Sequence, residues 1–278
     1  MTARGDFSRQ SFLGNDSSRI LADTRVAIVG LGGGGSHIAQ QLAHLGVGTF
    51  RLIDPEDIEA SNLNRLVGAT QADVEAGTAK VDIAKRTIRS IRPWSNVETA
   101  KSTWQVADGL LKDSHVIFGC VDGYRQRMYL NGAARRFCLP HIDIGMDVTR
   151  LSDGHFAVAG QMIMTLPDGP CMRCLGFLAQ ERLNREEDAY GSAGINPQVV
   201  WTNGTLASLA VGTFVRLVAP WYDATNNFEW LEFDGNRQLV QESRQPEFTV
   251  RGPCPHFTPL DVGDPFFELP VSRAGSLR

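Results

Sequence analysis

Three groups of residues in this chain of 278 amino acids have the types and spacing that ligand chemistry requires. The first is the run Gly30-Leu-Gly32-Gly33-Gly34-Gly35-Ser36, which holds GxGxxG at positions 30, 32 and 35. Glycines let the backbone approach phosphate oxygens closely, and a helix that begins there offers free N–H groups and a positive dipole end. Asp54 follows 24 residues after Gly30, where a carboxylate accepts hydrogen bonds from ribose hydroxyls. Together these residues predict a nucleotide site.

The second group is polar and charged, and it indicates which kind of nucleotide the site binds. Asn62, Arg65 and Lys80 are expected just past the carboxyl ends of the strands, where a doubly wound sheet binds its ligand. A dinucleotide needs little beyond the glycine loop, whereas a triphosphate that is cleaved needs cations on the leaving pyrophosphate and an acid that holds a metal. Arg65 and Lys80 are the candidate cations, and Asp122, at the end of a predicted strand, is the candidate Mg²⁺ ligand. Taken singly, each is also what a solvated surface charge looks like.

The third group has the spacing of a structural zinc site. Cys171 and Cys174 form a C-x2-C pair, and Cys254 and His256 form a distant second pair in which Phe257 stands where a fourth cysteine is usual. Cys171, Cys174, Cys254 and His256 are therefore candidate Zn²⁺ ligands. The alternative is a decayed site whose cysteines pack as apolar side chains.

The elements that must position the first two groups alternate between strand and helix. The pattern predicts a buried strand at 25–30, a helix that Ser36 caps and Gly46 ends, and a second strand at 49–54. A helix at 81–91, a strand at 115–122, a helix at 124–137 and a strand at 141–145 follow. Such units require right-handed crossovers and a parallel sheet. The fold class is therefore α/β, a Rossmann-like doubly wound, mainly parallel sheet.

The last third of the chain changes character. Residues 156–165 and 228–233 read as antiparallel strands, and residues 205–219 read as an apolar helix for a core or a dimer interface. This adds an antiparallel C-terminal extension to the sheet. We divide the chain into a polar N-terminal arm at 1–24, outside the core, and one domain at 25–278, with a nucleotide-binding half at about 25–150 and a partner-binding and zinc region at about 151–278. Cys120 and Cys138 are expected to be buried core thiols.

Composition excludes several classes of function. With 27 Lys+Arg against 31 Asp+Glu, the net charge of −4 gives no bulk attraction to nucleic acid or to anionic lipid. Residues 26–50 carry no charge, but their glycine block would break a membrane-spanning helix. The N-terminus lacks the apolar segment of a signal peptide. We expect a cytoplasmic protein that binds neither nucleic acid nor membrane, with cysteines that are reduced or bound to metal.

In combination, these motifs resemble the ThiF/MoeB family, the bacterial relatives of ubiquitin-activating enzymes. The resemblance runs from about residue 7 to residue 257. It rests on Ser8-Arg9-Gln10, GLGGGGS at 30–36, Asp54, SNLNR at 61–65, Lys80, CVD at 120–122 and PCMRCL at 170–175. Members of the family use ATP and Mg²⁺ to adenylate the C-terminal glycine carboxylate of a small ubiquitin-like or sulfur-carrier protein.

The resemblance implies a role for each matching residue. Asp54 would hold the ribose, Asp122 would bind Mg²⁺, and Asn62, Arg65 and Lys80 would hold the phosphates. Arg9 would reach into the partner's site of a homodimer. Family members that go on to form a thioester carry a cysteine near position 190, where this chain has Tyr190. The resemblance therefore implies adenylation without a catalytic cysteine of its own, and a loop at 181–188 that lies over the incoming glycine tail.

Two other functions stay open at this point. An NAD(P)-dependent oxidoreductase would explain the glycine loop and Asp54 but not Arg65, Lys80 and Arg9. A non-catalytic nucleotide-binding scaffold of a ubiquitin-like conjugation system would not need its charged residues intact. The carrier protein, its pathway and the group that receives the acyl-adenylate do not follow from the sequence.

Overall fold

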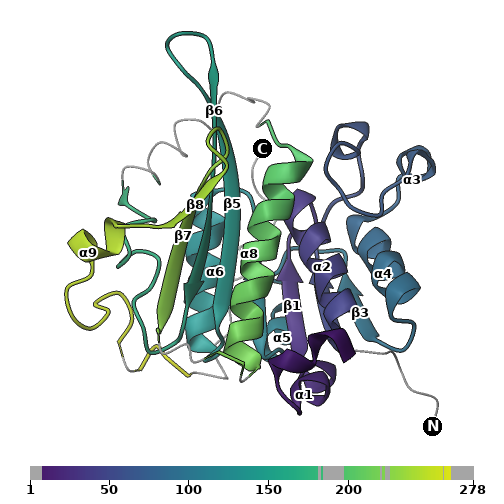
Figure 1. Cartoon of the computed structure of the whole chain (residues 1–278), viewed down its shortest axis with the longest axis horizontal. Coiled ribbons are helices and arrows are strands. Elements are labelled where there is room, and N and C mark those ends of the chain that lie inside the picture. Colours follow the sequence, from purple (N-terminus) through teal and green to yellow (C-terminus); the bar gives the residue numbers. More distant parts are fainter. Residues whose placement is uncertain are drawn as a thin grey trace.

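The computed structural model describes residues 8–180, 183, 197–219, 221–222, 226–258 and 260–263. Within them, one eight-stranded sheet runs in the order β3-β2-β1-β4-β5-β6-β7-β8 (Figure 1). The strands are β1 Arg25–Val29, β2 Thr49–Ile53, β3 Asn96–Ala100, β4 Val116–Gly119, β5 His141–Arg150, β6 Phe156–Thr165, β7 Phe228–Asp234 and β8 Leu239–Glu242. The first five are parallel, and β6, β7 and β8 pair antiparallel. The predicted sheet and its antiparallel extension are confirmed.

Helices cover both faces of this sheet. The longer ones are α2 Gly33–Leu45, α4 Lys80–Ile91, α6 Tyr124–Arg136 and α8 Val200–Val218, and the shorter ones are α1 Ser17–Asp23, α3 Gln71–Ala76, α5 Asp108–Lys112 and α9 Gln245–Thr249, with 3-10 turns at Ser8–Leu13 and Ala60–Asn62. Helices α2, α4 and α8 lie on one face and α5 and α6 on the other (Figure 1). Among the described helices, none is long and apolar enough to cross a bilayer.

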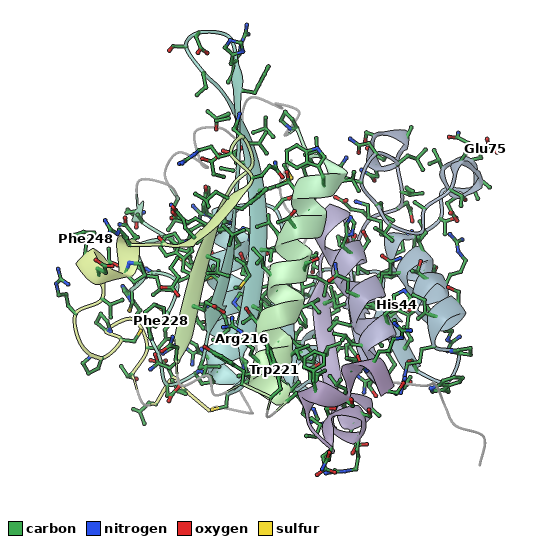
Figure 2. All side chains as sticks on the ribbon, viewed as in Figure 1. His44, Glu75, Arg216, Trp221, Phe228 and Phe248 are labelled. Atoms are coloured by element: carbon green, nitrogen blue, oxygen red, sulfur yellow. The ribbon has the colours of Figure 1, made fainter. Side chains whose placement is uncertain are left out.

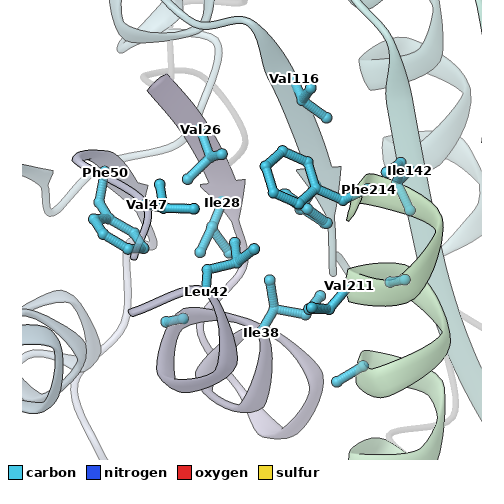
Figure 3. Packing of buried hydrophobic residues seen from close by; sticks show 14 of the residues in the cluster. Val26, Ile28, Ile38, Leu42, Val47, Phe50, Val116, Ile142, Val211 and Phe214 are labelled. Carbon is cyan, nitrogen blue, oxygen red and sulfur yellow. The ribbon is translucent and has the colours of Figure 1, made fainter. Parts of the chain in front are cut away.

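The larger core lies between the sheet and helices α2, α4 and α8. Val26 and Ile28 of β1 point from the sheet toward Ile38 and Leu42 of α2, and Phe214 of α8 closes the layer (Figure 3). These side chains come from alternate positions of the strand and from successive turns of the helix, because side chains on one face recur every two residues in a strand and about every 3.6 residues in a helix. The opposite faces of β1 and β4 pack on α6 in a smaller cluster. Both faces of the parallel strands are therefore buried, and the strand ends are left for a ligand.

The N-terminal segment, which the sequence placed outside the core as an arm, contributes residues to the core. Leu13 and Leu21 are buried members of the larger core, and Phe12 packs edge-on against Trp221, which follows α8 (Figure 2). Gly48 donates its N–H to the Leu21 carbonyl, which ties α1 to the start of β2. Two apolar residues in a polar segment are enough to anchor it because a well-placed leucine buries most of its side-chain area.

Three further local predictions are wrong. Helix α2 begins at Gly33 with Gly32 as its N-cap, so Ser36 is no cap: its hydroxyl donates to the Gly33 carbonyl and accepts from Val67 N–H. Helix α8 starts five residues before the expected position. Cys138 is exposed rather than buried, and it sits in a left-handed turn (φ 54°) after α6. Gly46 does end α2, in the left-handed conformation that favours glycine (φ 99°).

A long hairpin rises beside the strand ends. Strands β5 and β6 pair over ten residues each, whereas β7 joins β6 only from Ala159 onward. The tip of the hairpin therefore extends beyond the sheet, at the top of Figure 1. At the opposite end, Arg216 of α8 pairs with Glu229 of β7 and fixes the helix to the extension (Figure 2 labels Arg216 and neighbouring Phe228). The sheet thus carries a wall on the β5 side of the strand ends.

Candidate functional site

A cavity of about 650 Å³ opens at the carboxyl ends of β1, β2 and β4. Its lining includes the glycine loop, Asp54, Arg65, Lys80 and Asp122, together with Asn62. These residues come from segments up to about ninety positions apart in sequence, so only the parallel sheet brings them together. The cavity lies at the switch point between β1 and β4, where the chain order reverses and where such sheets bind ligands.

The glycines of the loop serve two different purposes. Gly30 has φ +88°, and a Cβ there would lie 2.3 Å from the Cys120 carbonyl oxygen. A Cβ on Gly35 would lie 1.9 Å from the Gly30 carbonyl oxygen, so both glycines are needed for the turn itself. A Cβ on Gly33 would meet Asn203 of α8 at 2.4 Å, whereas Gly32 has nothing within 4 Å and faces the cavity. Gly32 is therefore where a ligand approaches the backbone.

Asp54 joins the glycine loop to the end of β2. Its side chain is 5% exposed; Oδ2 accepts from Leu31 N–H at 2.6 Å and Oδ1 from Glu56 N–H at 2.9 Å. Burial raises the pKa of this carboxyl, and the two backbone N–H groups act against the rise. A carboxylate offers about four lone pairs, so two remain for a ligand's hydroxyls.

The two predicted cations are held differently. Lys80 is 7% exposed at the start of α4, and its ammonium pairs with the carboxylate of Glu56. Arg65 is half-buried, and its Nη1 donates to the Ser61 carbonyl at 2.6 Å and to Asn64 Oδ1 at 3.0 Å. Lys80 is a buried point charge beside the loop, and Arg65 is a guanidinium at the cavity mouth. Both are placed to contact an anion that enters the cavity.

Asn62 and Asp122 complete the predicted set around the cavity. Asn62 is buried, and its Oδ1 accepts from Glu59 N–H at 3.1 Å, which leaves its amide N–H groups for a ligand. Asp122 lies three residues beyond β4, is exposed to the cavity, and precedes Gly123, whose φ of +83° opens α6. An unshielded carboxylate at that place suits a hydrated Mg²⁺ ion.

Arg9 does not line the cavity of its own chain. Its neighbour Gln10 donates from Nε2 to the Leu45 carbonyl, at the C-terminal end of α2. The glycine loop is at the other end of this 13-residue helix, about 20 Å away at 1.5 Å per residue. Tyr190 and, apart from Leu183, the loop at 181–188 lie outside the described residues.

The four predicted zinc ligands do meet. Their ligand atoms all lie within 4.8 Å of one another. Cys171 Sγ is 3.7 Å from Cys174 Sγ, and His256 Nδ1 is 3.4, 3.3 and 4.0 Å from the sulfurs of Cys171, Cys174 and Cys254. A tetrahedral Zn²⁺ with bonds of about 2.0–2.3 Å needs ligand separations of about 3.5–3.8 Å. The donor set therefore fits zinc, with His256 in the place that a fourth cysteine would take.

Comparison with known proteins gives the family. A model of the ThiF family matches residues 7–254. The chain belongs to the ThiF family. It is 28% identical over 212 residues to the sulfur carrier protein ThiS adenylyltransferase of Escherichia coli, covering 73% of this chain and 78% of that protein. It is 30% identical over 165 residues to the SAMP-activating enzyme E1 of Haloferax volcanii, covering 59% of this chain and 57% of that one.

The solved structures extend the likeness in fold. The structure of E. coli MccB with ATP superposes with a TM-score of 0.71 at 20% identity, over 92% of this chain and 74% of MccB. The chain thus spans only part of its relatives, just over half of the Haloferax enzyme. The resemblance to the ThiF/MoeB family is confirmed, and the shared fold includes the doubly wound sheet described above.

Sequence reasoning missed several residues of this ThiF-family cavity. Glu56 pairs with Lys80, Asn203 of α8 packs on the loop at Gly33, and Arg127 of α6 forms part of the wall. Arg127 is 8% exposed and pairs with Asp143, which is fully buried in β5. One signal was available in the sequence: Asp143 lies between two isoleucines in a predicted buried strand, and a buried charge must have a partner because an unpaired one is costly.

Proposed function

We propose that this ThiF-family chain is an ATP-dependent adenylyltransferase that activates the C-terminal glycine carboxylate of a small ubiquitin-like or sulfur-carrier protein. The observation that supports this best is the single cavity that gathers a glycine loop, a buried ribose acid, two cations and an exposed carboxylate. The family model and the ThiS adenylyltransferase relative support the same reaction class.

Each residue has a role in this reaction. Asp54 accepts from the ribose hydroxyls, Gly32 lets the phosphates approach the start of α2, and Asn62 donates its amide N–H groups to them. The substrate carboxylate attacks the α-phosphorus, and the bond to the pyrophosphate oxygen breaks. Lys80 and Arg65 neutralise the charge that grows on the leaving pyrophosphate, and Lys80 exchanges Glu56 for phosphate oxygens.

Asp122 is the residue that would hold Mg²⁺. Its carboxylate is exposed to the cavity between the glycine loop and α6, and oxygen donors are what this ion prefers. When bound, Mg²⁺ supplies positive charge to the phosphate oxygens. The chain provides no nucleophile in this scheme, because both reactants are brought in line by binding alone.

The zinc site has a structural role in the proposal. Cys171 and Cys174 precede the apolar segment that packs on β7, and Cys254 and His256 belong to the chain after α9. A bound Zn²⁺ would join these two segments. All four ligands are used, which leaves no open position for catalysis.

A homodimer with Arg9 acting in trans completes the proposal. Arg9 is exposed and lies at the far end of α2 from its own glycine loop, so it has no access to its own cavity. A symmetric dimer is the commonest assembly of soluble chains. We also keep the cytoplasmic location, and the absence of nucleic-acid and membrane partners, as parts of the proposal.

Exchange of radiolabelled pyrophosphate into ATP tests the reaction. Recombinant carriers that end in Gly-Gly are added one at a time, each beside the same carrier without its last glycine. We expect exchange with at least one intact carrier and none with its shortened form, and Asp122→Asn should abolish it. Exchange without any carrier would contradict the proposal, as would none with the whole panel. Saturable binding of NADH in place of ATP would favour an oxidoreductase.

A further inference from the structure

The cavity wall on the β5 side carries an arginine that the nucleotide does not require. Arg127 lies in the first turn of α6, five residues after Asp122, and its side chain is 8% exposed. Along the strand ends, the order β2, β1, β4, β5 places the ribose acid, the glycine loop, Asp122 and Arg127 in a row. The first three serve the nucleotide in the proposed function. The β5 side is what remains for the acyl substrate.

The guanidinium of Arg127 is held by hydrogen bonds to β5. Its Nη1 donates to Oδ1 of Asp143 and, at 2.8 Å, to the Ile144 carbonyl. A Cβ on Gly145 would lie 2.6 Å from Nη2, so the guanidinium lies against the bare backbone of β5. A guanidinium has five N–H donors, and Nη1 accounts for two. Among the described residues, none accepts a hydrogen bond from Nε or Nη2.

Asp143 belongs to a buried polar layer whose other members do not hydrogen-bond to it. Asp143 and His141 are both inaccessible in β5, and Asp143 Oδ2 and His141 Nε2, 4.0 Å apart, have no hydrogen-bond partner in the described part of the chain. Asn131 of α6 lies 3.2 Å from His141 Nδ1. A Cβ on Gly119 would lie 2.6 and 2.7 Å from the two unpaired atoms, so β4 leaves room for them. A charge buried this deeply costs stability and calls for a purpose.

The ion pair with Asp143 fixes the orientation of the Arg127 guanidinium and balances its charge. A free cation beside the attacking carboxylate would stabilise that carboxylate and blunt its attack. The Asp143 carboxylate offsets the arginine's charge, so the free N–H groups suit a neutral acceptor such as a peptide carbonyl. The cavity lining continues from Arg127 to Gly145 and Met146 of β5, so the open space next to the guanidinium is bordered by a strand along which an extended chain can lie.

We propose that Arg127 binds the carbonyl of the peptide group just before the reacting carboxylate, and that buried Asp143 is the positioning residue that aims it. The proposal rests on the proposed function, because it assigns the acyl half of that same site. It predicts that the chain recognises a C-terminal peptide, and that recognition is separable from nucleotide binding.

Two acyl-adenylate analogues test this without knowledge of the carrier. Acetyl-sulfamoyladenosine and N-acetylglycyl-sulfamoyladenosine differ by one peptide group, and titration calorimetry gives the ratio of their dissociation constants. We expect the wild-type protein to bind the acetylglycyl compound about ten- to a hundredfold more tightly, the scale of a hydrogen bond to a charged group. The double variant Arg127→Gln/Asp143→Asn replaces the ion pair with two amides, avoids an unpaired buried charge, and should bring the ratio close to one.

Arg135 provides the matched control. It is a buried arginine of the same helix, and it donates to the carbonyls of Leu166 and Gly169, away from the cavity. Arg135→Lys should lower the melting temperature and leave the ratio unchanged. Asp143→Asn alone should lower the ratio while the affinity for the acetyl compound stays the same, which a purely structural role would not produce because both ligands share the nucleotide.

The outcomes separate this inference from the proposed function. If the double variant folds and keeps the wild-type ratio, Arg127 does not bind the peptide group. If the wild-type protein binds the acetyl compound but its ratio is close to one, the inference is wrong and the nucleotide site stands. If the wild-type protein binds neither compound, the proposed function is contradicted as well.

Discussion

Replacing Asp54 should separate its role in the fold from its role with the nucleotide. In the wild-type protein each carboxylate oxygen accepts one backbone N–H, from Leu31 in the glycine loop and from Glu56 after β2. Leu31 is fully buried, whereas Glu56 is exposed. Water can therefore replace the partner of Glu56 N–H but not that of Leu31 N–H.

The magnitudes follow from this difference. Asp54→Asn keeps one carbonyl oxygen for Leu31 and should cost about 1 kcal/mol of unfolding free energy, the net value of one hydrogen bond. Asp54→Ala leaves the buried Leu31 N–H without an acceptor and should cost about 2–3 kcal/mol, which is about 3–5 °C in melting temperature for a chain of this size. Both variants should weaken ATP binding about tenfold or more, because the ribose loses a charged acceptor.

Urea unfolding and ATP titration provide the assay, and Asp57→Ala is the control. Asp57 is three residues away and pairs with Lys101 in an exposed ion pair, so its loss should cost well under 1 kcal/mol. The pH dependence has a defined sign. Because burial raises the pKa of Asp54 above 3.8, the folded state keeps the proton longer, and its contribution to stability falls as pH rises through the folded pKa. Equal stability losses in the Asn and Ala variants, or unchanged ATP affinity in both, would refute this reasoning.

Four shorter predictions follow from other parts of the structure. Gly35→Ala should abolish ATP binding measured by calorimetry, because its Cβ would overlap the Gly30 carbonyl; wild-type affinity in this variant would contradict the role of the loop in binding ATP. Native mass spectrometry should find about one zinc ion per wild-type chain and less in Cys171→Ser. Iron instead of zinc in the wild-type protein would contradict the zinc site. Burial, helped by Arg127, lowers the pKa of His141 to about 3, so unfolding free energy should fall as pH drops from 6.5 to 4, and less so in His141→Gln; parallel curves would exclude this residue. Arg9→Ala should slow adenylation about a hundredfold. Mixing Arg9→Ala chains with Asp122→Ala chains should restore activity in part, and a mixture that stays inactive after proven subunit exchange would contradict the action of Arg9 in trans.

The alternation of strands and helices was readable from the sequence because periodicity follows directly from burial. Strand β1 and the end of α2 at Gly46 stood where the pattern placed them, since each depends on neighbours in the sequence. The residues that line the cavity could be grouped for a similar reason: Gly30, Asp54 and Asp122 follow the ends of β1, β2 and β4, and parallel strands end at one edge.

The burial of the N-terminal segment and the Arg127–Asp143 pair were missed for one physical reason, which is contact between distant segments, whereas the error at Ser36 is local. The burial of Leu13 and Leu21 depends on α2 and the start of β2, which local polarity does not reveal. Ser36 matches a capping residue, but the backbone of Gly33 already starts the helix. Arg127 and Asp143 meet only because α6 packs on β5, and no spacing rule links two residues sixteen positions apart on different elements.

Isotope transfer tests the central claim most directly. A Gly-Gly carrier whose C-terminal carboxylate carries ¹⁸O is incubated with ATP, Mg²⁺ and the wild-type protein, the acyl product is released with hydroxylamine, and the nucleotide is examined by mass spectrometry. Carboxylate attack on the α-phosphorus leaves one carboxylate oxygen on that phosphorus, so AMP should gain one ¹⁸O and unlabelled pyrophosphate should form. Formation of ADP with ¹⁸O in inorganic phosphate, or AMP without label, would contradict acyl adenylation in this cavity.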